Sequence, residues 1–404
     1  MSEWKKVKLG EISQTIQTGP FGSQLHQSDY SVIGIPVVMP KDIIAGNIEE
    51  ASIARVEQHH IDRLSRHMIS YGDILYARRG DVGKCAFTKQ NQEGWLCGTG
   101  CLRVTINPDM ANPKFVFFQL QKQETIGWIT NHAIGSTMLN LNTTILSNAP
   151  VEIPSLRIQN RIVEILSRYD SLIENYQKQI KLLEEVAQRL YKEWFIDLRF
   201  PGHENTKIID GVPEGWERKK VNSIIELQSG FAFKSSTFDD NGAYKIVTIK
   251  NVKDGAFDGD NVSRIVAIPE KMPKHCVLAD GDILLSLTGN VGRVCIVNGK
   301  NYLLNQRVAK LATDFKAFTY CLFRSREMFI EINNLANGAA QQNVSPIRIG
   351  EMKILLPNNK LLQVFESIVF KSIVRIISLQ SQLRLLTEAR DRLLPKLMSG
   401  EITI

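Results

Sequence analysis

The stretch IQNRIVEILSRYDSLIENYQKQIKLLEEVAQRLYKEWFIDLRF, residues 158–200, is the strongest structural signal in this 404-residue chain. Its apolar residues recur at alternating steps of four and three, a mean period of about 3.5 residues, which is typical of a coiled-coil seam. The seam comprises Ile158, Ile162, Ile165, Tyr169, Leu172, Tyr176, Leu183, Val186 and Leu190, with Gln179 in the one polar slot. This pattern predicts a helix of about 40 residues, roughly 60 Å long, which needs a partner of similar length.

The partner helix is predicted in the same chain. From Leu362 onwards the steps of four and three return, at Phe365, Val369, Ser372, Ile376, Leu379, Leu383, Leu386, Arg390, Leu393 and Leu397. Two such helices, each near the end of one half of the chain, indicate an internal duplication. Apolar stripes are usually packing surfaces, so we interpret both helices as structural struts without chemistry of their own.

The segments that precede the two helices also match each other. Both alternate short apolar runs with turn residues, as mixed sheets with a few helices do. The matched positions are Trp4 with Trp216, 39–43 with 248–252, Gly72-Asp73-Ile74-Leu75 with Gly281-Asp282-Ile283-Leu284, 80–84 with 289–293, Asn140 with Asn343, and Pro154 with Pro357. The duplication therefore includes the sheet-forming segments as well as the helices.

The sequence predicts an α+β fold with two mixed α/β domains and two long helices. The expected segments are a first domain at 1–155, a central long helix at 156–200, a connector at 201–212, a second domain at 213–358 and a C-terminal long helix at 359–404. Two like helices in one chain can pair antiparallel about a near-two-fold axis. We therefore expect a coiled coil that holds the two domains at opposite ends of a rod.

Composition restricts the class of protein only loosely. The net charge is +7, which is compatible with a polyanionic partner, and 43% of the residues are hydrophobic, an ordinary value for a folded protein. No run of eighteen apolar residues occurs and the first ten residues lack the apolar block of a signal peptide, so we expect a cytoplasmic protein. The six cysteines form no Cys-x-x-Cys pair, which favours free buried thiols over zinc ligands or disulfides.

Catalytic signatures of DNA-acting enzymes are missing. Neither Gly-Lys pair is followed by Ser or Thr, as a phosphate-binding loop requires, and no Pro-Pro dipeptide or Gly-x-Ser-x-Gly motif occurs. Asp210 with Glu217 and Lys219 imitates a metal-nuclease triad, but a solvated turn explains these residues better. The segment with His59, His60 and His67 lacks a carboxylate or thiol cluster. We interpret it as an exposed basic face, with phosphate contact as the functional alternative.

Two glycine-marked turns are the best candidates for contact with nucleic acid. Glycine at a turn is explained by positive φ alone, but in both copies basic residues follow the turn and could reach phosphates. Amides on neighbouring loops suit bidentate contacts to adenine. The candidate DNA-binding residues are Lys41, Arg78, Arg79, Lys84, Ser136, Thr137, Asn140, Lys250, Asn290, Arg293, Gln341, Gln342 and Asn343.

Three sets of residues together resemble one known family. The run Leu190-Tyr191-Lys192-Glu193-Trp194-Phe195-Ile196-Asp197-Leu198-Arg199-Phe200-Pro201-Gly202 resembles the end of the central helix in specificity subunits of type I restriction-modification systems. The run from Arg392 to Ile402 resembles that family's C-terminal helix. The paired Gly-Asp-Ile-Leu strands, each followed by Gly-x-Val-Gly, resemble its target recognition domains. The resemblance covers the whole chain in the right order.

The resemblance implies a non-catalytic subunit that binds double-stranded DNA. Each recognition domain would read one half of a split target, and the helices would fix the distance between the halves. Two methyltransferase subunits and restriction subunits would be its partners. S-adenosylmethionine and ATP would bind to those partners, so no cofactor is expected on this chain. The candidate partner-binding residues are Tyr191, Trp194, Phe195, Leu393 and Leu397.

Two other classes of function remain open on the sequence. One is a non-catalytic coiled-coil scaffold that organises protein partners without touching DNA. The other is a self-contained DNA-modifying enzyme, against which the missing motifs argue.

Overall fold

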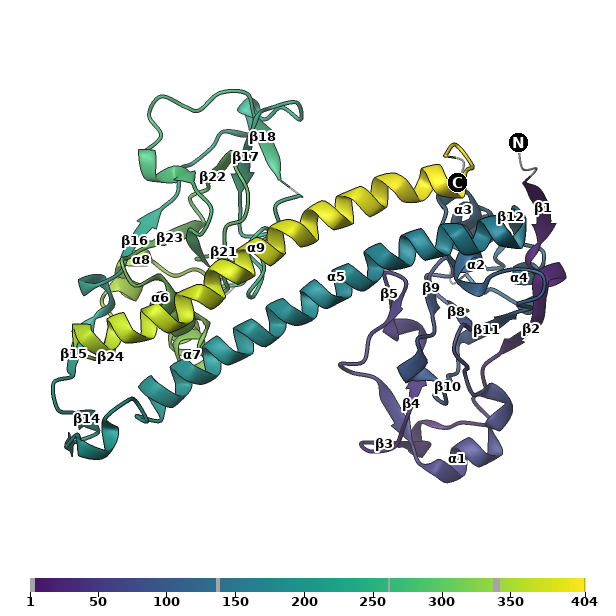
Figure 1. Ribbon diagram of the computed structural model, residues 1–404, viewed down its shortest axis with the longest axis horizontal. Coiled ribbons are helices and arrows are strands. Elements are labelled where there is room, and N and C mark those ends of the chain that lie inside the picture. The colour runs from purple at the N-terminus through teal and green to yellow at the C-terminus, as the bar shows by residue number, and fades with distance from the viewer. Residues whose placement is uncertain (1–3, 136–138, 261, 337–341, 403) are drawn as a thin grey trace. The chain divides into compact units, whose positions relative to one another are not determined.

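The computed structural model describes residues 4–135, 139–260, 262–336, 342–402 and 404. It divides into two compact units: unit 1 is Met1–Ser171 with Glu388–Ile404, and unit 2 is Leu172–Thr387. Each unit contains a sheet-rich domain and one end of each of the two long helices, α5 (Leu156–Tyr191) and α9 (Asn359–Met398) (Figure 1). The α+β fold class with two sheet-rich domains and long helices is confirmed.

The main sheet of unit 1 is antiparallel and is buried on both faces. Its strand order is β2 (Ser13–Thr18), β11 (Cys101–Ile106), β8 (Ile74–Ala77) and β9 (Cys85–Phe87). Side chains alternate across a strand, so Ile74 and Tyr76 join the core beneath α2 (Pro113–Leu120), while Leu75 joins a second core. Burial on both faces explains why the β8 sequence is continuously apolar.

A second sheet of unit 1 covers the other face of the main sheet. Its order is β10 (Leu96–Cys97), β4 (Ile35–Val38), β7 (Ala54–Val56) and β3 (Tyr30–Ser31), with β10 parallel to β4 and β7 antiparallel to it. Smaller pairs are β1 (Lys5–Lys8) with β12 (Pro150–Ile153), and β5 (Ile43–Ile44) with β6 (Asn47–Ile48). The remaining helices are α1 (Gln58–Arg63), α3 (Gln123–His132) and α4 (Thr143–Ser147).

Unit 2 repeats this topology. Its main sheet has the order β16 (Glu226–Ser229), β23 (Val308–Ala312), β20 (Ile283–Ser286) and β21 (Val294–Ile296). The second sheet is β18 (Ser263–Ile265), β17 (Tyr244–Val247), β22 (Tyr302–Leu304) and β19 (Val277–Leu278), again with one parallel pair, β17 with β22. The other elements are β15 (Glu217–Lys220) with β24 (Lys353–Leu356), β13 (Ile208–Ile209) with β14 (Val212–Pro213), α6 (Lys316–Arg324), α7 (Arg326–Leu335) and α8 (Pro346–Gly350).

The aspartates of the matched Gly-Asp-Ile-Leu runs have a structural role. Asp73 accepts a hydrogen bond from the Ser70 backbone N–H (2.8 Å), and its carboxylate lies 3.7 Å from Arg103 on β11. In unit 2, Asp282 accepts from the Ala279 N–H (2.9 Å) and pairs with Lys310 on β23 at 2.9 Å. Each aspartate therefore closes the turn before its strand and ties that strand to the next one.

In both units the long helices pack against each other and against the globular domain. In unit 2, Tyr191 of α5 and Phe365 of α9 have ring centroids 6.3 Å apart, and both belong to the core that includes α6. In unit 1, the Arg390 guanidinium of α9 lies 3.3 Å from the Asp170 carboxylate of α5. The start of α5 thus packs with the end of α9, and the end of α5 with the start of α9.

The predicted seam of α5 is wrong at two positions. Leu172 and Val186 are 42% and 61% exposed, whereas the next residues, Ile173 and Ala187, are 7% and 1% exposed. A straight α-helix drifts about 20° per heptad from a strict 3.5-residue repeat, so after several heptads the buried face moves towards the neighbouring residue. In α9 the same shift replaces Ser372 with the buried Ile373.

The end of α5 also differs from the predicted helix of 156–200. A π-helical turn, Lys192–Ile196, follows the α-helix, and Leu198 then adopts a left-handed φ of 57°. At the end of α9, the position of a Cβ on Gly400 would lie 2.6 Å from the Trp4 indole nitrogen, so the two ends of the described chain meet in unit 1.

At one matching contact, the glycine is on one side of the contact in unit 1 and on the other side in unit 2. A Cβ added to Gly10 would lie 1.9 Å from the Ser147 hydroxyl oxygen, and the matching residues of unit 2 are Asn222 and Gly350. We expect Gly10→Asn to destabilise unit 1 by about 1–3 kcal/mol through overpacking. Adding Ser147→Gly should recover at least half of that loss, measured by denaturant unfolding. A double variant as unstable as the single one would contradict the compensation.

Candidate nucleic-acid interface

One end of the main sheet in unit 1 gathers four loops. Backbone hydrogen bonds join them: Gly19 N–H donates to the Cys101 carbonyl (2.9 Å), Arg78 N–H to the Gly100 carbonyl (2.7 Å), and Leu141 N–H to the Arg78 carbonyl (2.8 Å). The loops that follow β2 and β8, precede β11 and precede α4 therefore form one continuous surface.

Gly19, at the start of the loop after β2, lies too close to the loop before β11 to carry a side chain. A Cβ on Gly19 would lie 2.1 Å from the Gly98 carbonyl oxygen, and a Cβ on the matching Gly230 of unit 2 would lie 2.3 Å from the Asn305 carbonyl oxygen. Any larger residue would push apart the loops that follow β2 and precede β11, and likewise those of β16 and β23.

Four predicted DNA-binding residues lie at this sheet end. Arg79 is exposed and forms a β-bridge with Asn140, and Arg78 precedes it. Lys84, after the same turn, is exposed and pairs with Asp81 at 3.1 Å. The Asn140 side-chain oxygen is buried and has no hydrogen-bond partner among the described residues. The structure thus brings three cations and one amide together.

The turn that carries Lys41 lies beside this surface. Pro40 packs 3.3 Å from the Cβ position of Gly100, whose carbonyl accepts from Arg78. The Lys41 ammonium is exposed and donates to the Ser52 carbonyl at 3.3 Å. Lys41 therefore lies on the adjoining turn and is directed partly towards its own loop.

The corresponding end of unit 2 is richer in amides. Asn343 forms a β-bridge with Thr288, and the Thr288 hydroxyl donates to the Asn343 side-chain oxygen (2.8 Å). Next to this pair, the Gly289 N–H donates to the Gln342 carbonyl (2.8 Å). Asn290 is exposed at the turn, and the Arg293 N–H donates to the Ser286 hydroxyl (3.0 Å). Lys250 is exposed on the turn that matches that of Lys41. The predicted residues Ser136, Thr137 and Gln341 lie outside the described residues.

Sequence reasoning missed two residues of these surfaces. Arg307 is exposed, and its carbonyl accepts from the Leu287 N–H (3.0 Å), as Gly100 accepts from Arg78 in unit 1. Phe21 is 52% exposed in the loop that begins at Gly19. Aligning the strands of the two units pairs Arg307 with Gly100, which lies at this surface in unit 1. That alignment would have identified Arg307.

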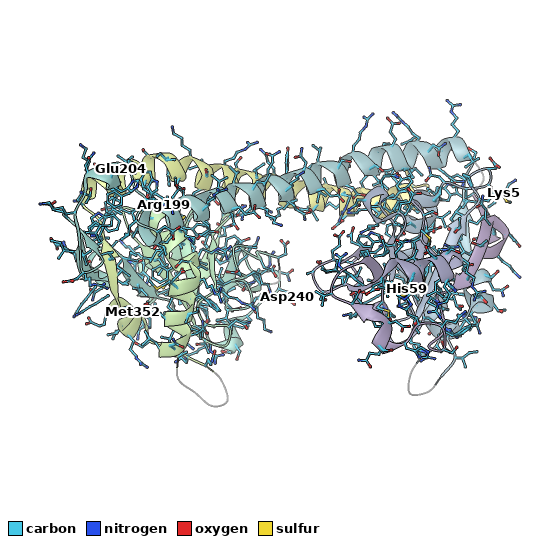
Figure 2. All side chains as sticks on the ribbon, turned by 90° about the horizontal axis from the view of Figure 1, so that it is seen from below. Lys5, His59, Arg199, Glu204, Asp240 and Met352 are labelled. Carbon is cyan, nitrogen blue, oxygen red and sulfur yellow. The ribbon has the colours of Figure 1, made fainter. Side chains whose placement is uncertain are left out.

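The histidine-rich segment of unit 1 is only partly the exposed basic face that we expected. His59 lies on α1 of unit 1 (Figure 2) and stacks on His60 with ring centroids 3.9 Å apart. His67, in contrast, is 3% exposed, and its Nδ1 donates to the Thr18 carbonyl at 3.0 Å. Burial, reinforced by the charge of Arg66, lowers the pKa of His67, so its ring remains neutral at pH 7. The segment holds the loop after β2 in place.

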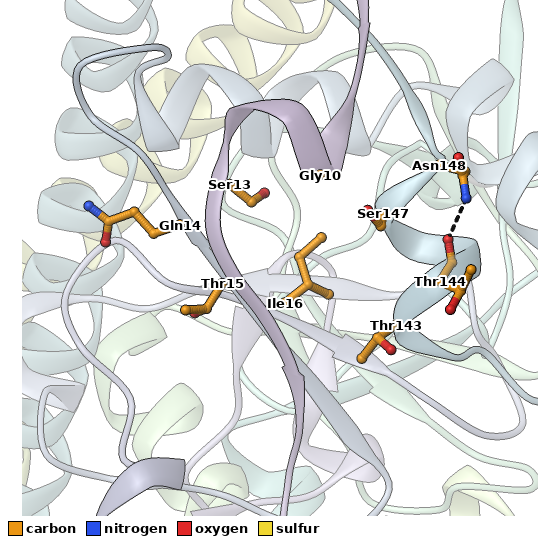
Figure 3. Close-up of a pocket in the computed structure, with 9 residues that line it drawn as sticks. All are labelled: Gly10, Ser13, Gln14, Thr15, Ile16, Thr143, Thr144, Ser147 and Asn148. Atoms are coloured by element: carbon orange, nitrogen blue, oxygen red, sulfur yellow. Dashed lines mark hydrogen bonds between the residues drawn. The ribbon is translucent and has the colours of Figure 1, made fainter.

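One pocket of unit 1 is lined by polar side chains without a titratable group. A pocket of about 380 Å³ between β2 and α4 is lined by hydroxyls and amides, such as Ser13, Thr143 and Asn148, with no carboxylate, imidazole or thiol (Figure 3). All six cysteines are buried, and burial raises the pKa of Cys85 and Cys97 to about 12. Among the described residues, no three His, Cys, Asp or Glu side chains are grouped to hold a metal.

The predicted partner-binding side chains lie mostly inside the chain's own cores. Tyr191, Trp194 and Phe195 are 4–6% exposed in the core of unit 2, and Leu397 is 1% exposed in that of unit 1, where Leu393 is half-buried. The reason is that each helix end docks into a globular domain. In this structure these side chains pack the helix ends, and their role in partner binding stays a prediction.

In the described part of the chain, none of the helices combines the length and apolar content that crossing a bilayer requires.

Comparison with known proteins gives one consistent result. Residues 1–185 and 213–384 match the family described as the type I restriction modification DNA specificity domain. The MjaIX specificity subunit of a type I restriction enzyme from Methanocaldococcus jannaschii is 27% identical over 100% of this chain and 94% of its own length. The HindI specificity subunit from Haemophilus influenzae is 20% identical, with full coverage of both chains. The crystal structure of a type I restriction-modification S subunit from M. genitalium shares the fold, with a TM-score of 0.64, 17% identity and coverage of 98% of this chain and 96% of that one.

Proposed function

Because the chain belongs to the type I restriction modification DNA specificity domain family, we propose that it is the subunit that reads DNA sequence in such a system. Each unit would bind one half of a split target. The observation that carries this proposal is the duplicated sheet end, where both units present cations and amides on loops joined by the same backbone hydrogen bonds. Phosphate contacts by the cations would position the duplex, and contacts to base edges would specify it.

The two long helices are proposed to set the distance between the half-sites. Both α5 and α9 are continuous in the chain from one unit into the other. A helix adds a fixed 1.5 Å per residue, whereas a flexible linker would permit many separations. We propose that this length specifies how many unread base pairs lie between the halves of the target.

The chain is proposed to act without chemistry of its own. Two adenine-N6 methyltransferase subunits and restriction subunits would supply catalysis and would bind S-adenosylmethionine and ATP. Exposed apolar side chains on the long helices of unit 2 are candidates for contact with these subunits: Val186 on α5 is 61% exposed, and Ile368 and Val374 on α9 are 48% and 49% exposed.

A salt titration tests the DNA-binding part of this proposal. We expect Lys84→Ala combined with Arg293→Ala to weaken binding similarly on all sequences. The slope of log affinity against log salt should become shallower by about 2, since each phosphate contact contributes about 0.9. Gel shifts of wild type and double variant over a range of salt concentrations measure both quantities.

A matched control removes the same charge elsewhere. Lys181→Ala with Arg392→Ala deletes two cations that are each 77% exposed on the long helices, and this variant should keep the wild-type slope. An altered base preference with an unchanged slope would contradict the phosphate assignment of Lys84 and Arg293. Absence of DNA binding by the wild type, even at low salt, would instead favour the scaffold and refute the proposed function.

A further inference from the structure

Phe21 and Arg78 form a pair at the proposed DNA-facing sheet end of unit 1, in which Phe21 is exposed and Arg78 is half-buried. We propose that this pair reads a thymine and a guanine in neighbouring base pairs of one half-site, with Phe21 contacting the thymine methyl group and Arg78 the guanine. This inference rests on the proposed function. It adds the residues and the bases that one of the two units discriminates.

The two side chains lie close enough together to reach neighbouring base pairs. The Arg78 guanidinium carbon lies 5.8 Å from the centre of the Phe21 ring. Successive base pairs are about 3.4 Å apart along the duplex, so this separation spans one step and falls short of two. The ring face also attracts the guanidinium, which limits the directions in which its fork of donors can point.

Phe21 is exposed although hydrogen bonds hold its loop in place. The Phe21 carbonyl accepts from Gln24 N–H (2.8 Å), and the Phe21 N–H donates to the Gln24 side chain (3.1 Å). From outside the loop, Arg63 donates to the Gln24 carbonyl (2.8 Å), and His67 donates to the Thr18 carbonyl (3.0 Å). A 52% exposed phenylalanine held in this way is ready for an apolar contact without further ordering.

The chemistry of each side chain favours one base. An apolar side chain in the major groove contacts the thymine methyl group, and an arginine fork donates to O6 and N7 of guanine. The Nε of Arg78 is buried, so the contact with guanine falls to the two terminal amino groups of the guanidinium.

The second unit lacks both members of the pair. By the register of the duplication, Phe21 corresponds to Ala232 and Arg78 to Leu287. The thymine and guanine should therefore be required in only one half of the target. The other half-site serves as an internal control for every measurement below.

Methylome sequencing of cells that express this chain with its methyltransferase partner tests the inference. The wild-type target should contain a thymine next to a guanine in one half-site. Phe21→Ala should relax the requirement at the thymine position, and Arg78→Ala at the guanine position, while the other half-site stays unchanged. Tyr71→Ala is the matched control, because Tyr71 is 58% exposed before the opposite end of β8 and should leave the target intact.

Base analogues measure the two contacts separately in the purified complex. Replacing that thymine with uracil should lower wild-type affinity about fourfold, the value of one buried methyl group, and should not affect Phe21→Ala. Replacing the guanine with 7-deazaguanine should lower wild-type affinity about tenfold and should not affect Arg78→Ala.

Failure of the inference is distinguishable from failure of the proposed function. A specific wild-type target without adjacent thymine and guanine, or Phe21 and Arg78 variants that keep full discrimination, would overturn the inference alone. So would an Arg78→Ala variant that weakens binding equally on all sequences, which would place Arg78 on a phosphate. A wild type that directs no methylation pattern and binds no duplex would remove the proposed function itself.

Discussion

Phe195→Ala is expected to destabilise unit 2 by about 3–5 kcal/mol, a large share of the stability of a typical domain. The Phe195 ring is 6% exposed, and its centroid lies 4.9 Å from that of Phe365, 5.1 Å from Phe318 and 5.3 Å from Tyr191. Truncation would leave a cavity where α5, α6 and α9 meet. Denaturant unfolding followed by near-ultraviolet circular dichroism would measure the loss.

The neighbouring residue provides the control for this prediction. Ile196 is 39% exposed in the same π-helical turn, so Ile196→Ala should cost less than about 1 kcal/mol. A Phe195→Ala protein that unfolds like the wild type but no longer binds its methyltransferase partner would show that Phe195 is a partner contact after all. That result would restore the interpretation drawn from the sequence.

Inserting seven residues into each long helix is expected to widen the gap between the half-sites by about three base pairs. One heptad adds about 10 Å to a helix, and base pairs are about 3.4 Å apart. Suitable points are between Ser171 and Leu172 of α5 and between Thr387 and Glu388 of α9, where the two units divide. A heptad preserves the apolar phase of each helix, so both half-sites should remain the same. Methylome sequencing would report the new target.

Insertion into one helix alone is the informative control. The pairing of α5 with α9 would then lose its register in one of the units, and specific methylation should disappear. An unchanged gap after insertion into both helices would refute the idea that the helices act as a ruler. It would leave base recognition by each unit untouched.

The sequence predicted the duplication well because its signals are periodic and local. Heptad spacing identified α5 and α9, and the paired Gly-Asp-Ile-Leu runs identified β8 and β20, since strand burial and turn closure by Asp73 and Asp282 depend on neighbours in sequence. The seam was misplaced at Leu172 and Val186 because helical drift accumulates along the chain.

Side-chain roles set by distant partners could not be predicted in this way. His67 turns inward because its acceptor is the carbonyl of Thr18, 49 residues earlier. Arg63 stays exposed, but its acceptor is the carbonyl of Gln24, 39 residues earlier. The sequence assigned Tyr191, Trp194 and Phe195 to a partner because an apolar helix face can pack either against its own chain or against another protein. The positions of Phe318 and Phe365 show that Phe195 packs inside unit 2.

The meeting of Trp4 with Gly400 has a consequence for how such a gene can be written. A permuted chain that joins these two positions through a short linker and opens at the exposed Gly211 of the connector should keep the packed contacts described within each unit. Packing inside the units does not depend on which of the two halves comes first in the polypeptide.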